Sequence, residues 1–201
     1  MKKTLTLRGV AFGALFAALL VVFGYFSIPL GFTPVPVTLQ TLAVMLAGGL
    51  LGARYGFFSM AIVVAMTAVG FPLLNGKGGM SAILGPTGGY VVSWPIVALL
   101  IGYSVSKVRS GTRPAQTGVI LAAMVVFGVF VQYVVGVPWL MQAAGLSLPA
   151  ALAGGLYPYI PGDLIKAVAA TLIVMSLRQT FPPERLTGHG DYAVRGRSHS
   201  G

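Results

Sequence analysis

Long apolar runs with very little charge are the feature that most limits how this chain can fold. Hydrophobic residues make up 56% of its 201 positions and charged residues 8%, with a mean hydropathy of +0.89. A single water-soluble core cannot bury that much apolar surface. The sequence therefore predicts an all-α integral membrane protein.

Breaks between the apolar runs predict six membrane-spanning helices, since about 20 residues cross ~30 Å of hydrocarbon. Prolines and glycines mark most of the boundaries. The first run follows MKKTLTLR and resembles a signal peptide, but it lacks a convincing small-residue cleavage site, so we expect a retained span. The neutral stretch 138–162 is expected to be partly helical and interfacial, because Trp139, Tyr157 and Tyr159 suit the headgroup level. The six spans are expected at residues 9–28, 38–53, 55–71, 90–105, 117–137 and 163–178.

Basic residues give these spans an orientation. Eleven of them fall on the side of the termini and only Lys77 falls opposite, which predicts cytoplasmic N- and C-termini. The Gly-rich stretch between the third and fourth spans, LLNGKGGMSAILGPTGG, then forms an outer loop. The eleven are Lys2, Lys3, Arg8, Arg54, Lys107, Arg109, Arg113, Arg178, Arg185, Arg195 and Arg197.

Asp163 is the only carboxylate among the first 180 positions. Pro161 and Gly162 before it predict a helix start with Asp163 at or near the N-cap. The remaining ~22 Å of helix to Arg178 would begin below the outer surface. Lys166, three residues on, shares a face with Asp163. Such charges in a membrane normally face a bundle interior or a wet cavity. The alternative is that Asp163 merely caps the helix and Lys166 neutralises it.

Asn75 and Lys77 lie in the Gly-rich stretch, so the topology places them at the same outer end as Asp163 and Lys166. A ligand arriving from outside would meet all four. The alternative for this stretch is a mobile turn. It is not a Walker A loop, because Gly78 follows Lys77 where Ser or Thr is required.

Several function classes are excluded by what the sequence lacks. There is no cysteine, and His189 and His199 both lie in the polar tail. Asp163 has no second carboxylate for acid–base work or metal binding. The net charge of +10 is spread between apolar runs without a basic patch carrying aromatics, which argues against nucleic acid. We therefore expect no catalytic residues, no metal, no cofactor and no enzyme activity.

Three motifs carry a resemblance to a known family. PVPVTLQTLAVMLAGGLLG at 34–52, LGPTGGY at 84–90 and GDLIKA at 162–167 resemble, in this order and spacing, BioY, the biotin-specific S component of energy-coupling factor (ECF) transporters. The resemblance covers the chain to about residue 178, which predicts one substrate-binding domain over 1–180. The polar tail 181–201 lies outside it and is expected to be disordered.

The resemblance implies that biotin binds at the outer side of the membrane. It implies that Asp163 and Lys166 are ligand contacts: the carboxylate can accept from the ureido N–H groups, and the ammonium can meet either the ureido oxygen or the valerate carboxylate. Asn75 is a candidate further partner of the ureido group, and Lys77 is a candidate partner of the carboxylate. Glycines of LGPTGGY would let the backbone approach the ligand. Tyr90, at the end of that motif, is a candidate contact for which simple packing is the alternative. The three glycines are Gly85, Gly88 and Gly89.

The resemblance also implies partners and a place in the cell. A transmembrane T component and two ABC-type ATPases would drive uptake, and Ala14-xxx-Ala18 matches the family's first-helix motif for docking the T component. The location would be the plasma membrane of a bacterium or archaeon. Alternatives are an S component for another vitamin, such as thiamin or riboflavin, and an intramembrane enzyme.

Overall fold

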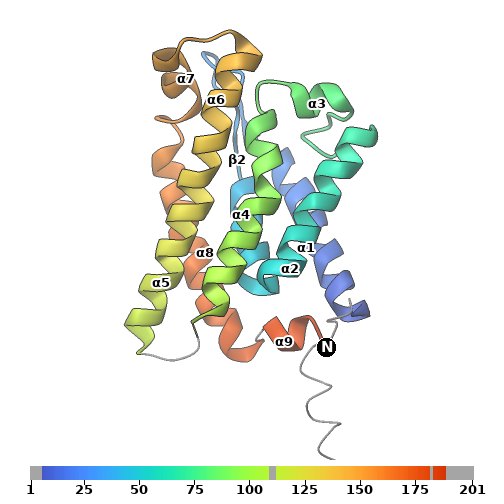
Figure 1. Cartoon of the computed structure of the whole chain (residues 1–201), viewed down its shortest axis with the longest axis vertical. Coiled ribbons are helices and arrows are strands. Elements are labelled where there is room, and N and C mark those ends of the chain that lie inside the picture. The colour runs from blue at the N-terminus through green and yellow to red at the C-terminus, as the bar shows by residue number, and fades with distance from the viewer. Residues whose placement is uncertain (1–5, 109–111, 182, 189–201) are drawn as a thin grey trace, which may run out of the picture.

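Helices account for most of the described chain. The computed structural model describes residues 6–108, 112–181 and 183–188. Besides a two-stranded antiparallel ribbon, these residues form helices that run mostly side by side (Figure 1). The elements are α1 (Leu7–Tyr25), β1 (Ser27–Ile28), β2 (Val37–Thr38), α2 (Gln40–Val69), α3 (Met80–Leu84), α4 (Gly88–Ser106), α5 (Arg113–Val125), the π-helix η1 (Val126–Val131), α6 (Gln132–Ala144), α7 (Leu148–Gly155), α8 (Ile160–Thr180) and α9 (Pro183–Leu186).

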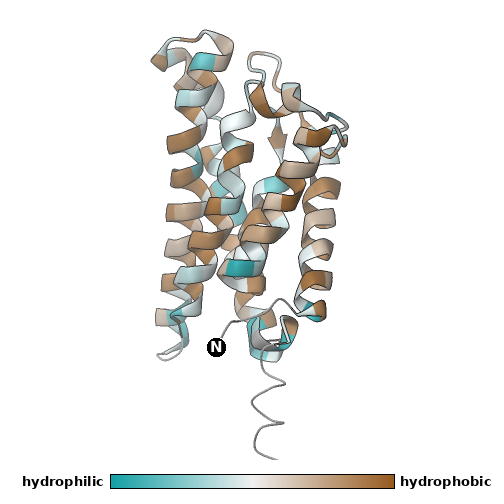
Figure 2. Ribbon diagram, turned by 45° about the vertical axis from the view of Figure 1, so that its right-hand side comes forward, coloured by the Kyte–Doolittle hydropathy of each residue, from teal (hydrophilic) through white to brown (hydrophobic). Residues whose placement is uncertain are grey.

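Five helical stretches within the described residues are long and apolar enough to cross a membrane. Many of their large apolar side chains point outward, which suits contact with lipid rather than water, and brown apolar positions run along the spans in Figure 2. The predicted class, a helical membrane protein, is confirmed. The five stretches are Leu7–Tyr25, Gln40–Val69, Gly88–Ser106, Arg113–Ala144 and Ile160–Thr180.

Helix α2 is broken at Gly52, whose backbone is not helical (φ 77°, ψ 179°). A positive φ of this kind favours glycine. Beyond the break the chain packs back against itself: a Cβ on Gly56 would lie 3.1 Å from the carbonyl oxygen of Ala47 and from the Cα of Gly48. The expected second and third spans are thus joined by a turn of very few residues.

Close contact between α2 and α4 forms the centre of the bundle, and small residues make it possible. A Cβ on Gly48 would lie 2.6 Å from the carbonyl oxygen of Ala98, and one on Gly102 would lie 2.3 Å from the backbone nitrogen of Ala53. These backbones could not approach so closely with larger side chains. The two helices therefore form a rigid wall for whatever lies beside them.

Helix α8 begins earlier than the sequence indicates. It starts at Ile160 with Tyr159 as N-cap, and the backbone N–H of Asp163 donates to the carbonyl oxygen of Tyr159 at 2.8 Å. Asp163, which we expected at or near the N-cap, lies in the first turn of α8, because Pro161 is tolerated there instead of stopping the helix. With 21 residues, α8 is roughly 30 Å long, so it is not the short helix that we expected.

The fifth predicted span also continues further than expected. Helix α6 runs through Pro138 to Ala144, so Pro138 does not end it. In a membrane bundle, neighbouring helices and local π adjustments compensate for the missing hydrogen bond of such a proline. Only α7 remains as a separate helix in the stretch that we expected to be partly helical and interfacial.

The two ends of the described chain meet at one end of the bundle. The backbone N–H of Thr6 donates to the hydroxyl of Tyr55 at 2.9 Å, and the Thr6 hydroxyl donates to the carbonyl oxygen of Thr187. Helix α3, helix α7 and the β-ribbon lie at the opposite end (Figure 1). The tail prediction concerns 181–201, of which 182 and 189–201 lie outside the described residues, while Pro183–Leu186 forms α9.

Candidate functional site

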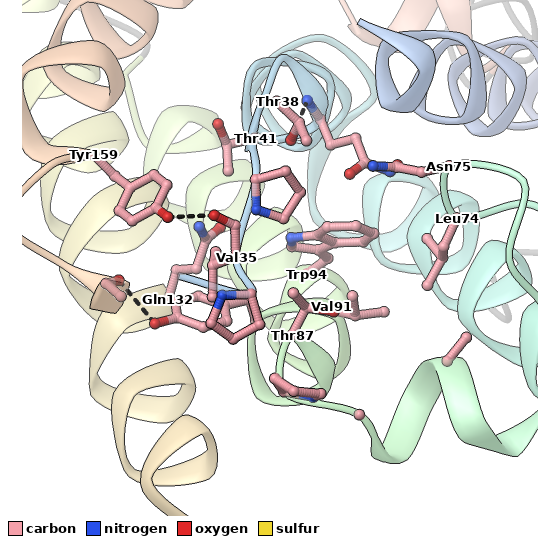
Figure 3. A pocket seen from close by; sticks show the side chains of 18 of the residues that line it. Val35, Thr38, Thr41, Leu74, Asn75, Thr87, Val91, Trp94, Gln132 and Tyr159 are labelled. Carbon is pink, nitrogen blue, oxygen red and sulfur yellow. Dashed lines mark hydrogen bonds between the residues drawn. The ribbon is translucent and has the colours of Figure 1, made fainter. Parts of the chain in front are cut away.

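A cavity of about 270 Å³ lies where the β-ribbon, the segment around α3, and helices α4, α6 and α8 converge. It brings together six of the candidate residues from distant parts of the sequence. The surrounding side chains are drawn in Figure 3. The six are Asn75, Lys77, Gly85, Tyr90, Asp163 and Lys166.

Asp163 and Lys166 form an ion pair on the wall of this cavity. The Lys166 Nζ lies 2.9 Å from the Asp163 Oδ1, and the Asp163 residue is only 3% exposed. Thr41 donates to the same oxygen at 3.2 Å, and the hydroxyl of Tyr133 donates to Oδ2. Residues of three helices, α2, α6 and α8, therefore meet at a single carboxylate.

All three donor positions of the Lys166 ammonium are used by the protein. Besides Asp163, the ammonium donates to the carbonyl oxygen of Thr38 at 2.5 Å and to the hydroxyl of Thr41 at 3.1 Å. A lysine has no fourth hydrogen to offer. The pair is thus held by its surroundings at the cavity wall. The contact between Lys166 and Asp163 also fits the alternative in which Lys166 neutralises Asp163, so a ligand role for the two residues stays a prediction.

Asn75 is presented to the cavity by a tight hairpin turn. Its φ is 53° and that of Gly76 is 76°, while Leu74 and Lys77 exchange backbone hydrogen bonds of 3.1 and 2.8 Å. Two consecutive residues with positive φ define the type I′ turn, for which Asn-Gly is the preferred sequence. This part of the Gly-rich stretch is therefore an ordered turn, and Lys77 is exposed at the rim of the cavity.

The glycines of LGPTGGY do not all have the expected position. Gly85 lines the cavity, whereas Gly88 and Gly89 are not among the lining residues. A Cβ on Gly88 would lie 1.8 Å from the carbonyl oxygen of Ile83, and one on Gly89 would lie 2.3 Å from the Cβ of Trp139. These two glycines let α4 pack against α3 and α6, which differs from the expected approach of backbone to ligand.

Tyr90 combines the two roles that the sequence left open. Its ring lines the cavity and packs edge-on against Tyr133, with the ring centroids 6.2 Å apart. Its hydroxyl donates to the carbonyl oxygen of Gly155 at 2.8 Å, tying α4 to α7. Packing is thus established for Tyr90, and contact with a ligand stays a prediction.

Sequence reasoning missed several polar residues of the cavity. Thr38 and Thr41 hold the ion pair, and both lie in the motif PVPVTLQT, which was used only to recognise the family. Polar or aromatic residues inside apolar runs were the available signal. The residues missed are Thr38, Gln40, Thr41, Trp94, Gln132 and Tyr133.

Three of these residues carry a buried polar atom without a hydrogen-bond partner in the described part of the chain. The atoms are the Nε2 of Gln40, the Nε1 of Trp94 and the Oε1 of Gln132. Leaving such an atom unpaired costs about 1–3 kcal/mol. A cavity that carries this cost is ready for a ligand with complementary polar groups. Within the described residues there is no group of three His, Cys, Asp or Glu side chains that could hold a metal.

A side chain from α6 holds a segment that lines the cavity, residues 80–87. The indole Nε1 of Trp139 donates to the carbonyl oxygen of Gly85 at 3.0 Å. Replacing Trp139 with Phe removes this bond and keeps an aromatic ring, so we expect local opening of residues 80–87 to become easier by about 0.5–1.5 kcal/mol. Amide hydrogen exchange measures this change. Tyr103→Phe, at the other end of α4, is the control, and unchanged exchange in the Trp139 variant would contradict the role.

A helical membrane bundle with a partly polar cavity at one end defines a membrane protein that holds a small molecule. Comparison with known proteins specifies this class further. The BioY family model matches residues 1–183. The chain is 37% identical to the biotin transporter BioY of Lactococcus lactis subsp. cremoris, covering 88% of this chain and 91% of that one. It is 38% identical to that of Rhodobacter capsulatus, covering 94% and 100%.

A solved structure shows the same arrangement of helices. The crystal structure of the S-component for biotin from an ECF-type ABC transporter superposes with a TM-score of 0.76 at 35% identity, covering 86% of this chain and 91% of that one. This protein belongs to the BioY family. The family expectation from the three motifs is thereby confirmed.

Proposed function

We propose that this protein is the substrate-capture component of an ECF-type transporter and that its substrate is biotin. Membership of the BioY family supports the class, and the cavity supports a polar ligand of modest size. The observation that carries the proposal is the buried pair of Asp163 and Lys166 on the wall of that cavity. The family is one of transporters, and no enzyme activity is proposed.

Biotin has groups that match this cavity. Its ureido ring offers two N–H donors and one oxygen acceptor, and its valerate chain ends in a carboxylate. Asp163 keeps one acceptor position of Oδ2 for an N–H, since the Tyr133 hydroxyl occupies the other. Asn75 offers an amide from the hairpin turn, and Lys77 offers an exposed ammonium at the rim, where a carboxylate on a flexible chain would end. Lys166 acts by holding the Asp163 carboxylate in place.

We further propose that the chain crosses the membrane six times, with its termini in the cytoplasm. The break at Gly52 supports this count, because it divides α2 into two segments that fold back on each other. The excess of basic residues on the side of the termini supports the orientation. The cavity, at the opposite end of the bundle, then opens toward the outside.

Delivery of the ligand needs partners in this proposal. A transmembrane T component and two ABC-type ATPases would move the loaded protein so that its cavity opens to the cytoplasm of a bacterium or archaeon. Ala14 and Ala18 support a docking face on α1. Both are exposed, whereas Gly9, Gly13 and Ala17 on the other side of this helix are buried.

Calorimetric titration of the purified protein with biotin tests the proposed function. We expect saturable binding of biotin and none of thiamin or riboflavin under the same conditions. Binding of one of those vitamins in place of biotin would contradict biotin as the ligand but would still support a substrate-capture component. Absence of binding to all three in folded protein would overturn the capture role itself.

A further inference from the structure

Gln132 lies at a point where the helix geometry changes. The π-helix η1 ends at Val131, and Gln132 is the first residue of α6. A π-turn inserts an extra residue into a helix, and such insertions are frequent at functional sites. One residue of offset rotates everything that follows by about 100°. Gln132 and Tyr133 both follow this offset, and both line the cavity.

The two neighbours are used differently by the protein. The hydroxyl of Tyr133 donates a hydrogen bond to Asp163, whereas the Oε1 of Gln132 has no partner among the described residues. Gln132 is only 4% exposed, so bulk water does not replace the missing donor. A residue needed only for packing would be apolar at such a position, because a buried polar atom without a partner lowers stability.

Two donors on the same cavity complement this acceptor. The Nε1 of Trp94 and the Nε2 of Gln40 are likewise buried without a partner in the described chain, at 4% and 5% residue exposure. The cavity therefore presents one acceptor and two donors that the protein itself does not satisfy. Lys166, by contrast, has all three of its donors in use.

We infer that Gln132 is a specificity-determining contact whose Oε1 accepts one N–H of the ligand's ureido ring, while Trp94 and Gln40 donate to ligand oxygens. This inference rests on the proposed function, since it assumes a ligand of the biotin type. It assigns recognition of the ureido ring to an uncharged side chain as well as to the ion pair. A ligand without an N–H at this position leaves Gln132 unpaired and is rejected.

The test compares two proteins with three ligands. Wild type and Gln132→Met are titrated with biotin and with its two analogues that carry a methyl group on one or the other ureido nitrogen. For biotin, we expect the substitution to weaken binding about tenfold or more. Methylation of the nitrogen that faces Gln132 should weaken binding to wild type at least tenfold and have a much smaller effect on the variant. Methylation of the other nitrogen should affect both proteins equally.

Thermal unfolding without ligand provides the second measurement. Because methionine fills similar volume without the unpaired oxygen, ligand-free Gln132→Met should melt at the same temperature as wild type or higher. Equal biotin affinity of the two proteins would overturn the inference alone. A loss that is the same for all three ligands, with a lower melting temperature, would make Gln132 a packing residue. Wild-type protein that binds no biotin would overturn the proposed function together with the inference.

Discussion

Replacing Asp163 with asparagine should weaken biotin binding by about 1.5–3 kcal/mol, or roughly 10- to 150-fold. The carboxylate accepts hydrogen bonds from Thr41, Tyr133 and Lys166 and lies on the cavity wall. The amide removes the negative charge, so an N–H of the ligand loses a charge-assisted bond. The partly buried ammonium of Lys166 also loses its counter-charge, which is costly in a low-dielectric interior. Titration calorimetry of purified protein measures the affinity.

Two further variants separate binding from folding. Asp163→Asn combined with Lys166→Met removes both charges, and we expect it to recover melting temperature relative to Asp163→Asn without recovering affinity. Thr171→Ala is the matched control on α8, because Thr171 is buried and its hydroxyl bonds only to the carbonyl oxygen of Ala167 within the same helix. Wild-type affinity in folded Asp163→Asn would show that the carboxylate charge has no part in recognition.

Replacing both Ala14 and Ala18 with tryptophan should abolish association with the transmembrane partner and leave biotin affinity unchanged. Small residues on an exposed helix face let another helix approach closely, and a large ring at each position separates the two backbones. The two alanines face away from the core, since the buried side of α1 is formed by other residues. Co-purification from membranes containing the partner subunits measures association, and calorimetry measures binding.

Ala122→Trp is the control for this prediction. Ala122 is an exposed alanine on α5, which lies on the opposite side of the bundle from α1 (Figure 1). The control should keep both binding and association. If the partner subunits still co-purify with the Ala14 and Ala18 variant, the docking face lies elsewhere on the protein.

The helical membrane class followed from the sequence, because hydropathy reports directly on transfer into hydrocarbon. The boundaries of the helices could not be predicted in the same way. The sequence rule that proline stops a helix failed at Pro161, in the first turn of α8, and at Pro138 within α6. Both prolines are accommodated by their surroundings. The predicted start of α8 was a few residues too late, so Asp163 lies in the first turn of the helix and not at the N-cap itself.

The candidate site was predicted in part. The scarcity of carboxylates singled out Asp163 and Lys166, and the topology placed Asn75 beside them, which the cavity lining agrees with. Gly88 looked like a ligand-approach residue but packs against the backbone of α3. Gln132 was missed, because a single glutamine in an apolar run does not reveal which way its side chain faces. That depends on the π-turn before it.

By itself, the sequence determined that the protein lies in a membrane, that its fold is helical and which family it belongs to. All three depend on composition and on short motifs. Only the tertiary structure decided which polar atoms are satisfied by the protein and which are left for a ligand. Hydrogen bonding is a property of atoms within about 3 Å of one another. The bonds of Asp163 and Lys166 to Thr38, Thr41 and Tyr133 join segments up to 128 residues apart, so they exist only once the helices have packed.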